Sequence, residues 1–496
     1  MNNQKKQSSF ITGICVFLTV LGFLCIFSAG WYISVFGDVG VDSIIYTLFS
    51  DSAGVNKEIV YKYIFCAFIP AVVLALAVIW ALFWKKKKIA YKNIFPFNRK
   101  VSVAISIVLS LTLITVACLQ VKVFGFVYNI SVKTNIYEEK YALPKETKIV
   151  FPEDKQNVVY IMLESMETTY FSEEQGGALK ESAIPELYSL AKENTNFSHN
   201  DTVGGYYCMS GASWTMGSIV AQTSGIPLKI PKYIFGNNSG STFLQGAYSV
   251  INILEDNGYY TSVMYGSNAS YGNRDVYYKD HGIDKIYDYK TAQTDGIIEE
   301  GYYDGWWGME DKYLFEYAKQ ELVKIAEREE PFFFTMLTVD THHVSGNLCD
   351  KCGKTHDNQY ENVLSCSSKQ ISEFVNWIQS QDFYENTTIV IVGDHCTMDA
   401  AYIRKNVGSD YNRRIYNCII NSKIESNNTK NRVFCAMDLF PTTLAAMGCT
   451  IEGDRLGLGT NLYSDTPTLC EEMGVENFVS EISKNSAYYY SKFMPD

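Results

Sequence analysis

Three long apolar runs occupy the first part of the chain and restrict what it can fold into. They cover residues 10–36, 63–84 and 101–121. Each run is close to the ~20 residues with which an α-helix crosses the hydrocarbon core of a bilayer. A buried helical hairpin can imitate one such run, but hardly three in succession. The pattern therefore predicts a multi-pass membrane domain over residues 1–121 with three transmembrane helices.

Lysine and arginine are distributed unevenly among the segments that flank these runs. Lys5 and Lys6 precede the first run and a basic stretch, residues 85–100, separates the second from the third, whereas the loop between the first two is mainly acidic. Because cytoplasmic loops are enriched in Lys and Arg, we expect a cytoplasmic N-terminus. Everything after about residue 122 then lies outside the cell membrane. The formal net charge of −12 argues against a nucleic-acid partner.

The rest of the chain has the pattern of a folded domain behind a short connection. Residues 122–155 have mixed charge and no sustained period, and are predicted to be a juxtamembrane linker. Over residues 156–496, short apolar segments alternate with helical ones. Strands are expected at 157–163, 259–264, 331–339 and 387–392, and helices at 242–258, 307–328, 370–379, from 436 and after 465. This alternation predicts an α/β domain with a largely parallel sheet flanked by helices.

One uncharged stretch, residues 204–228, is unusually rich in glycine and hydroxyl side chains. It reads GGYYCMSGASWTMGSIVAQTSGIPL. A surface loop would normally carry charges, and a core strand would hold fewer glycines. The composition suits a tight turn that presents a hydroxyl at the mouth of a pocket and then enters a helix, as hydroxyl nucleophiles often are displayed. We predict that Thr215 is this nucleophile, with Ser213 as its main rival.

Acidic and imidazole groups follow two of the predicted strands. Glu164 ends the strand at 157–163, and Asp394 with His395 ends the strand at 387–392. Carboxyl ends of parallel strands share one edge of a sheet, so these groups can converge with Thr215. Two carboxylates, an imidazole and a hydroxyl could hold a divalent cation, which would activate the hydroxyl and offset charge on a phosphoryl group. A helix N-cap is the alternative role for Glu164.

Two further positions are candidates for substrate contact. His342 and His343 follow the strand at 331–339, and Arg274 lies in a predicted loop. From residue type alone, hydrogen-bonded structural histidines and a solvated surface arginine are the alternatives.

Five motifs together resemble the alkaline-phosphatase-like sulfatase superfamily. They are VVYIMLESMETTYF, SWTMGSIVAQTSGIPL, LTVDTHH, GDHCTMD and RLGLG, in that order. The chain is specifically similar to the membrane phosphoglycerol transferases, that is, phosphoglycerol transferase I and, more distantly, lipoteichoic acid synthase. The resemblance covers roughly residues 155–465 and the preceding membrane segments. It departs from lipoteichoic acid synthases at Gly272, where they carry Trp, and at Tyr265, where they carry a substrate-side His.

The resemblance implies a role for each candidate. One divalent metal, Mn²⁺ first and Mg²⁺ or Zn²⁺ as alternatives, would be held by Glu164, Thr215, Asp394 and His395. Thr215 would also be the nucleophile, His342 would lie on the substrate side, and Arg274 would contact the glycerophosphate.

The resemblance also implies the reaction. Phosphatidylglycerol would donate glycerol phosphate to Thr215 with release of diacylglycerol, and a hydroxyl of an envelope glycan or polymer would accept it. A phosphoethanolamine transferase acting on lipid A or an envelope glycan shares the same four ligands. A plain sulfatase and a non-catalytic membrane sensor or envelope-binding protein are the remaining alternatives.

The cysteines add one unexplained cluster. Nine of the thirteen lie after the apolar runs, an odd number that cannot pair completely. Cys349, Cys352 and Cys366 form, with His356, the pattern C-x2-C-x3-H-x9-C, which resembles a small zinc knuckle. In an exported domain a disulfide between Cys366 and one of the pair is favoured, and unpaired thiols are a third alternative.

Overall fold

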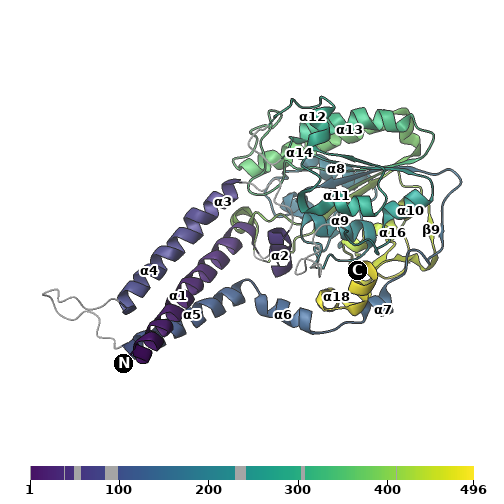
Figure 1. Cartoon of the computed structure of the whole chain (residues 1–496). Helices are drawn as coiled ribbons and strands as arrows, with labels where there is room; N and C mark the ends of the chain where they lie inside the picture. The colour runs from purple at the N-terminus through teal and green to yellow at the C-terminus, as the bar shows by residue number, and fades with distance from the viewer. Residues whose placement is uncertain are drawn as a thin grey trace. The chain divides into compact units, whose positions relative to one another are not determined.

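The chain divides into two compact units. The computed structural model describes residues 2–37, 40–49, 57–83, 99–229, 242–302, 308–408 and 410–495 (Figure 1). Most of the basic stretch that predicts orientation, residues 84–98, and position 307 lie outside the described residues. The first unit comprises Met1–Val41 and Asn56–Val127, and the second comprises Asp42–Val55 and Tyr128–Asp496.

The first unit holds three helices that are long and apolar enough to cross a membrane. These spans are Phe10–Phe36, Ile59–Phe83 and Arg99–Gln120. They lie in α1 (Asn2–Phe36), in α3 (Lys57–Tyr63) continued through a π-helical turn (Ile64–Phe68) into α4 (Ile69–Phe83), and in α5 (Arg99–Gln120). The three apolar runs of the sequence are therefore confirmed as candidate spans.

Small and hydroxyl side chains bring α1 and α5 together. Thr19 Oγ1 lies 2.8 Å from Ser106 Oγ, and Ser106 Oγ also donates to the Cys15 carbonyl at 3.2 Å. Large apolar side chains on the same helices are exposed instead, with Phe17 at 65% and Val108 at 64%. Polar contacts inside and apolar groups outside are what a lipid environment favours.

Seven strands form the main sheet of the second unit, in the order β3, β8, β7, β2, β6, β4, β5. Their bounds are β2 Asn157–Leu163, β3 Gly205–Tyr206, β4 Tyr260–Tyr265, β5 Lys285–Tyr287, β6 Phe332–Leu337, β7 Thr387–Gly393 and β8 Ile415–Ile420. The five neighbours from β7 to β5 are parallel, and β8 and β3 continue the sheet in antiparallel fashion. The predicted largely parallel sheet is confirmed.

The central strands are apolar along their whole length because both faces of the sheet are covered. On β2, Val158, Tyr160 and Met162 enter one core, whereas Val159 and Ile161 enter the other. One face packs against α9, α10 and α16, and the opposite face packs against α8, α13 and α14 (Figure 1).

The helices of the second unit are mostly short. Their bounds are α2 Val41–Phe49, α7 Ile136–Lys140, α8 Pro185–Glu193, α9 Thr215–Ser224, α10 Val250–Asp256, α11 Arg274–Asp280, α12 Tyr289–Thr294, α13 Asp311–Ala326, α14 Gln359–Gln379, α15 Ala400–Asn406, α16 Leu439–Ala446, α17 Leu469–Met473, α18 Val475–Ser483 and α19 Ala487–Phe493. The helix expected at 242–258 is shorter because Ser249 and Asn252 form a capping box at its start. The helix expected at 370–379 begins earlier, where Asn358 caps α14.

The segment expected as a linker, residues 122–155, contains regular structure. It holds α6 (Val123–Ser131), α7 and β1 (Ile149–Val150), and β1 pairs with β9 (Thr450–Ile451). Tyr137 of α7 is buried against Tyr489 and Phe493 of α19, with ring centroids 5.4 and 6.1 Å away. A second small hairpin joins β10 (Arg455–Leu456) and β11 (Gly459–Thr460) in the predicted Gly-rich turn.

A pair of buried carboxyls ties α13 to the end of β6. Asp311 accepts the backbone N–H of Val339 at 2.7 Å and that of Asp340 at 3.2 Å, and Asp340 accepts that of Asp311 at 3.1 Å. Burial raises the pKa of Asp311 to about 7, and burial together with the Asp311 charge raises the pKa of Asp340 well above its ordinary value. The two carboxyls together therefore retain one proton up to near-neutral pH.

This shared proton predicts a pH dependence of stability. The unfolded chain releases it near the ordinary Asp pKa of about 4, so the contribution is fully present below that pH and is lost as the pH rises toward 7. We expect Asp311→Asn to flatten the fall in stability between pH 5 and 7 by up to about 1.4 kcal/mol per pH unit. Thermal unfolding of the detergent-solubilised chain at several pH values between 5 and 7 would measure this dependence of stability on pH. The exposed Asp382→Asn is the control, and an unchanged slope in Asp311→Asn would contradict the shared proton.

Candidate metal centre

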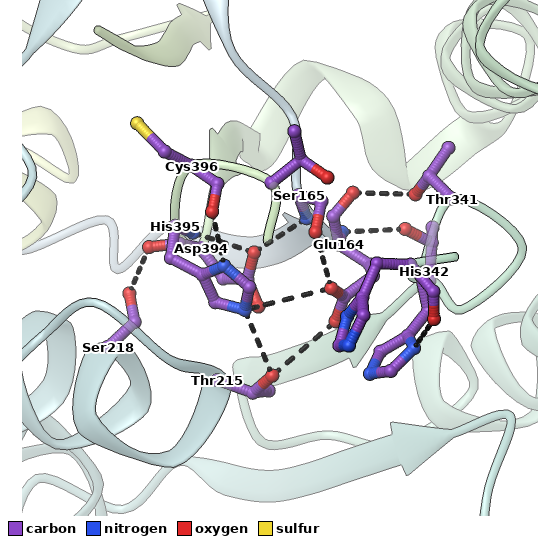
Figure 2. Close-up of polar contacts among 12 residues, drawn as sticks. Glu164, Ser165, Thr215, Ser218, Thr341, His342, Asp394, His395 and Cys396 are labelled. Atoms are coloured by element: carbon purple, nitrogen blue, oxygen red, sulfur yellow. Dashed lines mark hydrogen bonds and ion pairs between the residues drawn. The ribbon is translucent and has the colours of Figure 1, made fainter. Parts of the chain in front are cut away.

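Four of the predicted site residues converge at the carboxyl edge of the parallel strands (Figure 2). Glu164 follows β2, Asp394 and His395 follow the neighbouring β7, and Thr215 is the first residue of α9. Thr215 Oγ1 lies 3.4 Å from Glu164 Oε2 and 3.3 Å from His395 Nε2. His395 Nε2 lies 3.3 Å from Asp394 Oδ2 and 3.6 Å from Glu164 Oε1.

Backbone contacts between the two strand ends fix the carboxylates. The backbone N–H of Asp394 donates to the Leu163 carbonyl at 3.1 Å. Asp394 Oδ1 in turn accepts the backbone N–H groups of Ser165 at 2.8 Å and of His395 at 2.7 Å. Glu164 receives a hydrogen bond at Oε1 from Ser165 Oγ at 2.7 Å. Both carboxylates are therefore held in one orientation by the ends of β2 and β7.

The free atoms of the centre fit a divalent cation. His395 Nδ1 pairs with the Cys396 carbonyl at 3.0 Å, so Nδ1 carries a hydrogen and Nε2 faces the centre, where it would bind a metal once deprotonated. Asp394 Oδ2 is buried and has no hydrogen-bond partner in the described part of the chain. Glu164, Asp394 and His395 each offer a donor atom within 4.8 Å of the others. Oxygen donors with one imidazole suit Mn²⁺, Mg²⁺ or Zn²⁺.

The pKa values of the side chains in the centre also favour a bound cation. Burial and the nearby Glu164 raise the pKa of Asp394 to about 7. Burial lowers the pKa of His395, but Asp394 and Glu164 outweigh it and raise the value to about 8. Two buried carboxylates this close to one imidazole favour a positive charge among them.

The turn before α9 delivers Thr215 to this edge. Trp214 is extended at the N-cap (φ −145°, ψ 160°), so the helix begins at Thr215, where its dipole favours negative charge on an oxygen. Ser218, one turn later, donates from Oγ to the Asp394 carbonyl at 2.6 Å and links α9 to the metal-centre loop. Ser213 is half-buried.

His342 reaches the same edge on the loop after β6. Thr341 Oγ1 donates to the Glu164 carbonyl at 2.5 Å, which draws this loop against the end of β2 (Figure 2). His342 Nδ1 pairs with the His343 carbonyl at 2.7 Å, which leaves Nε2 as the acceptor nitrogen. Burial, assisted by the positive charge of His395, lowers the pKa of His342 to about 4, so its imidazole is neutral at pH 7.

Arg274 is buried, and the surface alternative weighed from the sequence is wrong. Only 2% of it is exposed, and its guanidinium lies 4.4 Å from the Tyr265 ring centroid and 5.6 Å from that of Tyr271. Nη2 donates to Ser267 Oγ at 2.7 Å, whereas Nε is buried without a hydrogen-bond partner among the described residues. The Arg274 charge contributes to the low pKa of His342, which places the two within electrostatic range.

Sequence reasoning missed a buried ion pair behind the centre. Glu167 accepts from Arg413 Nε at 2.7 Å and from the backbone N–H of Thr397 at 3.0 Å. Arg413 Nη2 also donates to the Thr397 carbonyl at 2.8 Å, so the pair clamps the loop that begins with Asp394. Neither the polar ESMETTYF segment that carries Glu167 nor the residues near Arg413 pointed to this role in the sequence.

Tyr46 was also missed. It lies on α2, between the first two spans, yet its hydroxyl donates to the Gly272 carbonyl beside Arg274. Its ring centroid is 6.0 Å from that of Trp214 and 6.5 Å from that of Phe243. Nothing in a loop between two spans indicated that one of its side chains would contact this edge.

The close approach at Gly393 generates a prediction. A Cβ there would lie 2.0 Å from the Met166 carbonyl oxygen and 2.6 Å from Ile415 Cγ2. Gly393→Ala should displace Asp394 and lower the affinity for a divalent metal by about 10-fold or more. Calorimetric titration of both variants with Mn²⁺ measures the metal affinity. Gly408→Ala is the matched control, because a Cβ there meets nothing within 4 Å. Equal affinities in both variants would contradict the steric requirement.

Comparison with known proteins identifies the family. The sulfatase family profile matches residues 156–449. Phosphoglycerol transferase I of Escherichia coli (strain 55989) is 31% identical over 261 residues, which are 51% of this chain and 33% of the relative. The matched region therefore spans about a third of the length of this curated relative.

Two solved structures share the fold. A lipoteichoic acid synthase from Listeria monocytogenes is 20% identical with a TM-score of 0.50, over 64% of this chain and 79% of that one. The integral membrane lipooligosaccharide phosphoethanolamine transferase A from Neisseria meningitidis is 11% identical with a TM-score of 0.51, over 88% of this chain and 84% of that one. With a family profile that covers more than half of its length, the chain belongs to the sulfatase family, in the alkaline-phosphatase-like superfamily.

Proposed function

We propose that the chain is a membrane-bound, metal-dependent phosphoglycerol transferase. In this proposal it moves glycerol phosphate from phosphatidylglycerol through a covalent Thr215 intermediate to a hydroxyl of an envelope glycan or polymer. The observation that carries it is the position of Thr215 Oγ1, 3.3 and 3.4 Å from His395 and Glu164 in a buried set of metal-type donors. The identity to phosphoglycerol transferase I supports the choice of transferred group.

The proposal assigns the metal to four side chains, namely Glu164, Thr215, Asp394 and His395. A bound divalent ion, Mn²⁺ in our proposal, would supply a lowered hydroxyl pKa and a positive charge against the phosphoryl oxygens. The oxygen-rich donor set supports Mn²⁺ or Mg²⁺ ahead of Zn²⁺.

The chain's own residues then account for two displacements at phosphorus. Thr215 Oγ1 gives up its proton and forms a bond to phosphorus while the bond to the diacylglycerol oxygen breaks, and that oxygen takes up a proton as diacylglycerol leaves. The acceptor hydroxyl next attacks the same phosphorus and gives up its proton, the bond to Thr215 breaks, and Thr215 Oγ1 takes up a proton again. His342, neutral and with Nδ1 bonded to the His343 carbonyl so that Nε2 is the acceptor nitrogen, is our candidate for the removal of the acceptor's proton.

Arg274 supports glycerol phosphate over ethanolamine phosphate. It is a buried cation whose charge affects the pKa of His342, and its Nε has no hydrogen-bond partner among the residues that the structure describes. A fixed positive charge attracts a phosphate but repels the ammonium group of ethanolamine. The buried arginine therefore favours the uncharged glycerol head group.

The three candidate spans support a location in the cell membrane. We propose that the N-terminus is cytoplasmic and the catalytic unit extracytoplasmic, as the Lys and Arg bias indicates. That orientation gives the site access to the lipid donor and to envelope hydroxyls on one side of the bilayer.

The nucleophile is tested by replacing one hydroxyl. Thr215→Ala should lower release of diacylglycerol from phosphatidylglycerol vesicles by about 10³-fold or more, because the covalent route is lost. Ser213→Ala, two residues away, is the matched control and should keep the wild-type rate. Quantified diacylglycerol and the mass of a glycerophosphorylated Thr215 peptide are the measurements. Full turnover in Thr215→Ala would remove Thr215 from its assigned role.

The donor is tested by offering two head groups to one preparation. Phosphatidylglycerol should be turned over and phosphatidylethanolamine should not. Arg274→Gln should reduce kcat/KM for phosphatidylglycerol by about 10- to 100-fold, the size of a lost charge-assisted hydrogen bond. Preferential turnover of phosphatidylethanolamine would instead identify a phosphoethanolamine transferase, and turnover of neither lipid with metal present would favour a non-catalytic protein.

A further inference from the structure

Three cysteine side chains converge away from the candidate metal centre. Cys349 and Cys352 lie in the connection between β6 and α14, and Cys366 lies on α14. The Sγ atom of Cys349 is 3.7 Å from that of Cys352 and 3.7 Å from that of Cys366, and all three sulfurs lie within 4.8 Å of one another. All three are free thiols in this structure, so the disulfide favoured from the sequence is not formed among them.

The separations are those of ligands around a single ion. Sulfurs bound to one Zn²⁺ at about 2.3 Å in tetrahedral geometry lie about 3.8 Å apart. Both separations, 3.7 Å, match this tetrahedral edge. Cys349 and Cys366 are each only 7% exposed, so the cluster is enclosed by protein rather than spread over the surface.

Hydrogen bonds around the sulfurs favour the thiolate form of Cys349, whereas the thiols of Cys352 and Cys366, which donate to it, have raised pKa values and would lose their protons only to a bound metal. The C-x2-C turn closes with a hydrogen bond from the Cys352 N–H to the Cys349 carbonyl at 3.1 Å, and Cys352 Sγ accepts the Cys349 N–H at 3.3 Å. Hydrogen bonds from the two neighbouring thiols, and then from the N–H groups of Lys351 and Cys352, lower the pKa of Cys349. Gln370 Nε2 donates to Cys366 Sγ at 3.4 Å.

We propose that Cys349, Cys352 and Cys366 form a second metal site that binds zinc through three thiolates. A non-sulfur donor such as water would complete the tetrahedron. Soft thiolates select zinc, whereas the oxygen-rich centre at Asp394 suits harder ions, so one chain would separate two metals by ligand chemistry. His356, grouped with the cysteines by sequence spacing, faces Glu361 Oε2 with Nδ1 at 3.5 Å and is not needed for the site.

The position of the cluster gives the ion a structural role. The connection that carries Cys349 and Cys352 also carries Thr341 and His342, while Cys366 belongs to the long helix α14. An ion shared by the three sulfurs would tie this connection to α14. Lys312 of α13 holds the same turn by an ion pair with Asp350 at 2.9 Å.

Metal analysis of the full chain in detergent, purified without reductant, tests the site. We expect one zinc equivalent per chain to be lost in Cys349→Ser and in Cys366→Ser. Cys449→Ser, a buried cysteine outside the cluster, should keep the wild-type content. Equal zinc content in all four proteins would overturn the proposal. The readout is independent of transferase activity, so it stands or falls separately from the proposed function.

Cobalt substitution tests the wild-type chain and avoids dependence on the folding of the variants. Chelator-treated protein titrated with Co²⁺ should develop thiolate-to-cobalt charge-transfer absorption. Asp394→Asn should keep this band, because the centre at Asp394 contains no sulfur ligand. Absence of the band would overturn the proposal, as would peptide mapping that finds Cys366 disulfide-linked to Cys349 or Cys352 in the zinc-free protein as purified.

Discussion

The close approach of two buried carboxylates governs the arrangement of the candidate metal centre. Glu164 and Asp394 are fully buried, and both lie beside His395 Nε2, at 3.6 and 3.3 Å. Like charges in a low dielectric repel strongly, and burial together with this repulsion from Glu164 raises the pKa of Asp394. Among the described residues Asp394 Oδ2 has no hydrogen-bond partner, and His395 turns Nε2 toward the centre. A site built in this way is stable only when positive charge sits among its donors.

Such a charge pair needs rigid support, because a small displacement would change every distance around it. The support comes from three directions. Strand pairing joins the end of β2 to the end of β7, Ser218 links α9 to the Asp394 carbonyl, and the Glu167–Arg413 pair clamps Thr397 from behind. Gly393 allows the loop to begin in a space that a side chain would fill. The catalytic proposal therefore depends on the packing of the sheet as much as on the donors.

The sequence predicted those parts of the fold that depend on local patterns. The strands β2, β6 and β7 are continuous apolar runs because both faces of the sheet are covered, and such runs are visible in the sequence. Strand β8 was not predicted, because Asn417 and Cys418 interrupt its apolar run, and β3 is too short to carry a pattern. The helix expected at 242–258 begins only at Val250, because Ser249 caps its N-terminus.

The site residues also divide into those that a local sequence pattern predicts and those that depend on contacts distant in sequence. Glu164 and Asp394 were found because an acid directly after an apolar strand is a local signal, but their proximity depends on β2 lying next to β7, which strand content alone does not determine. Arg274 was weighed mainly as a surface residue because its neighbours in sequence are polar. Its burial depends on Tyr265 from β4 and on Tyr46, whose hydroxyl reaches the carbonyl of the adjacent loop. Those contacts are long-range and leave no mark in the local pattern.

Tyr46 and Gly272 lie side by side at the loop that carries Arg274. Here position 272 is a glycine with φ +65°, and a Cβ on it would lie 3.9 Å from Tyr46 Cε1 and from the Tyr46 hydroxyl oxygen. A large side chain at 272 and the present position of Tyr46 therefore compete for neighbouring space. Tyr271 of the loop itself lies beside Arg274, and Tyr46 of α2, between the first two spans, adds a hydrogen bond to the Gly272 carbonyl of the same loop. The part of the chain between two membrane segments thus helps to shape the wall beside Arg274.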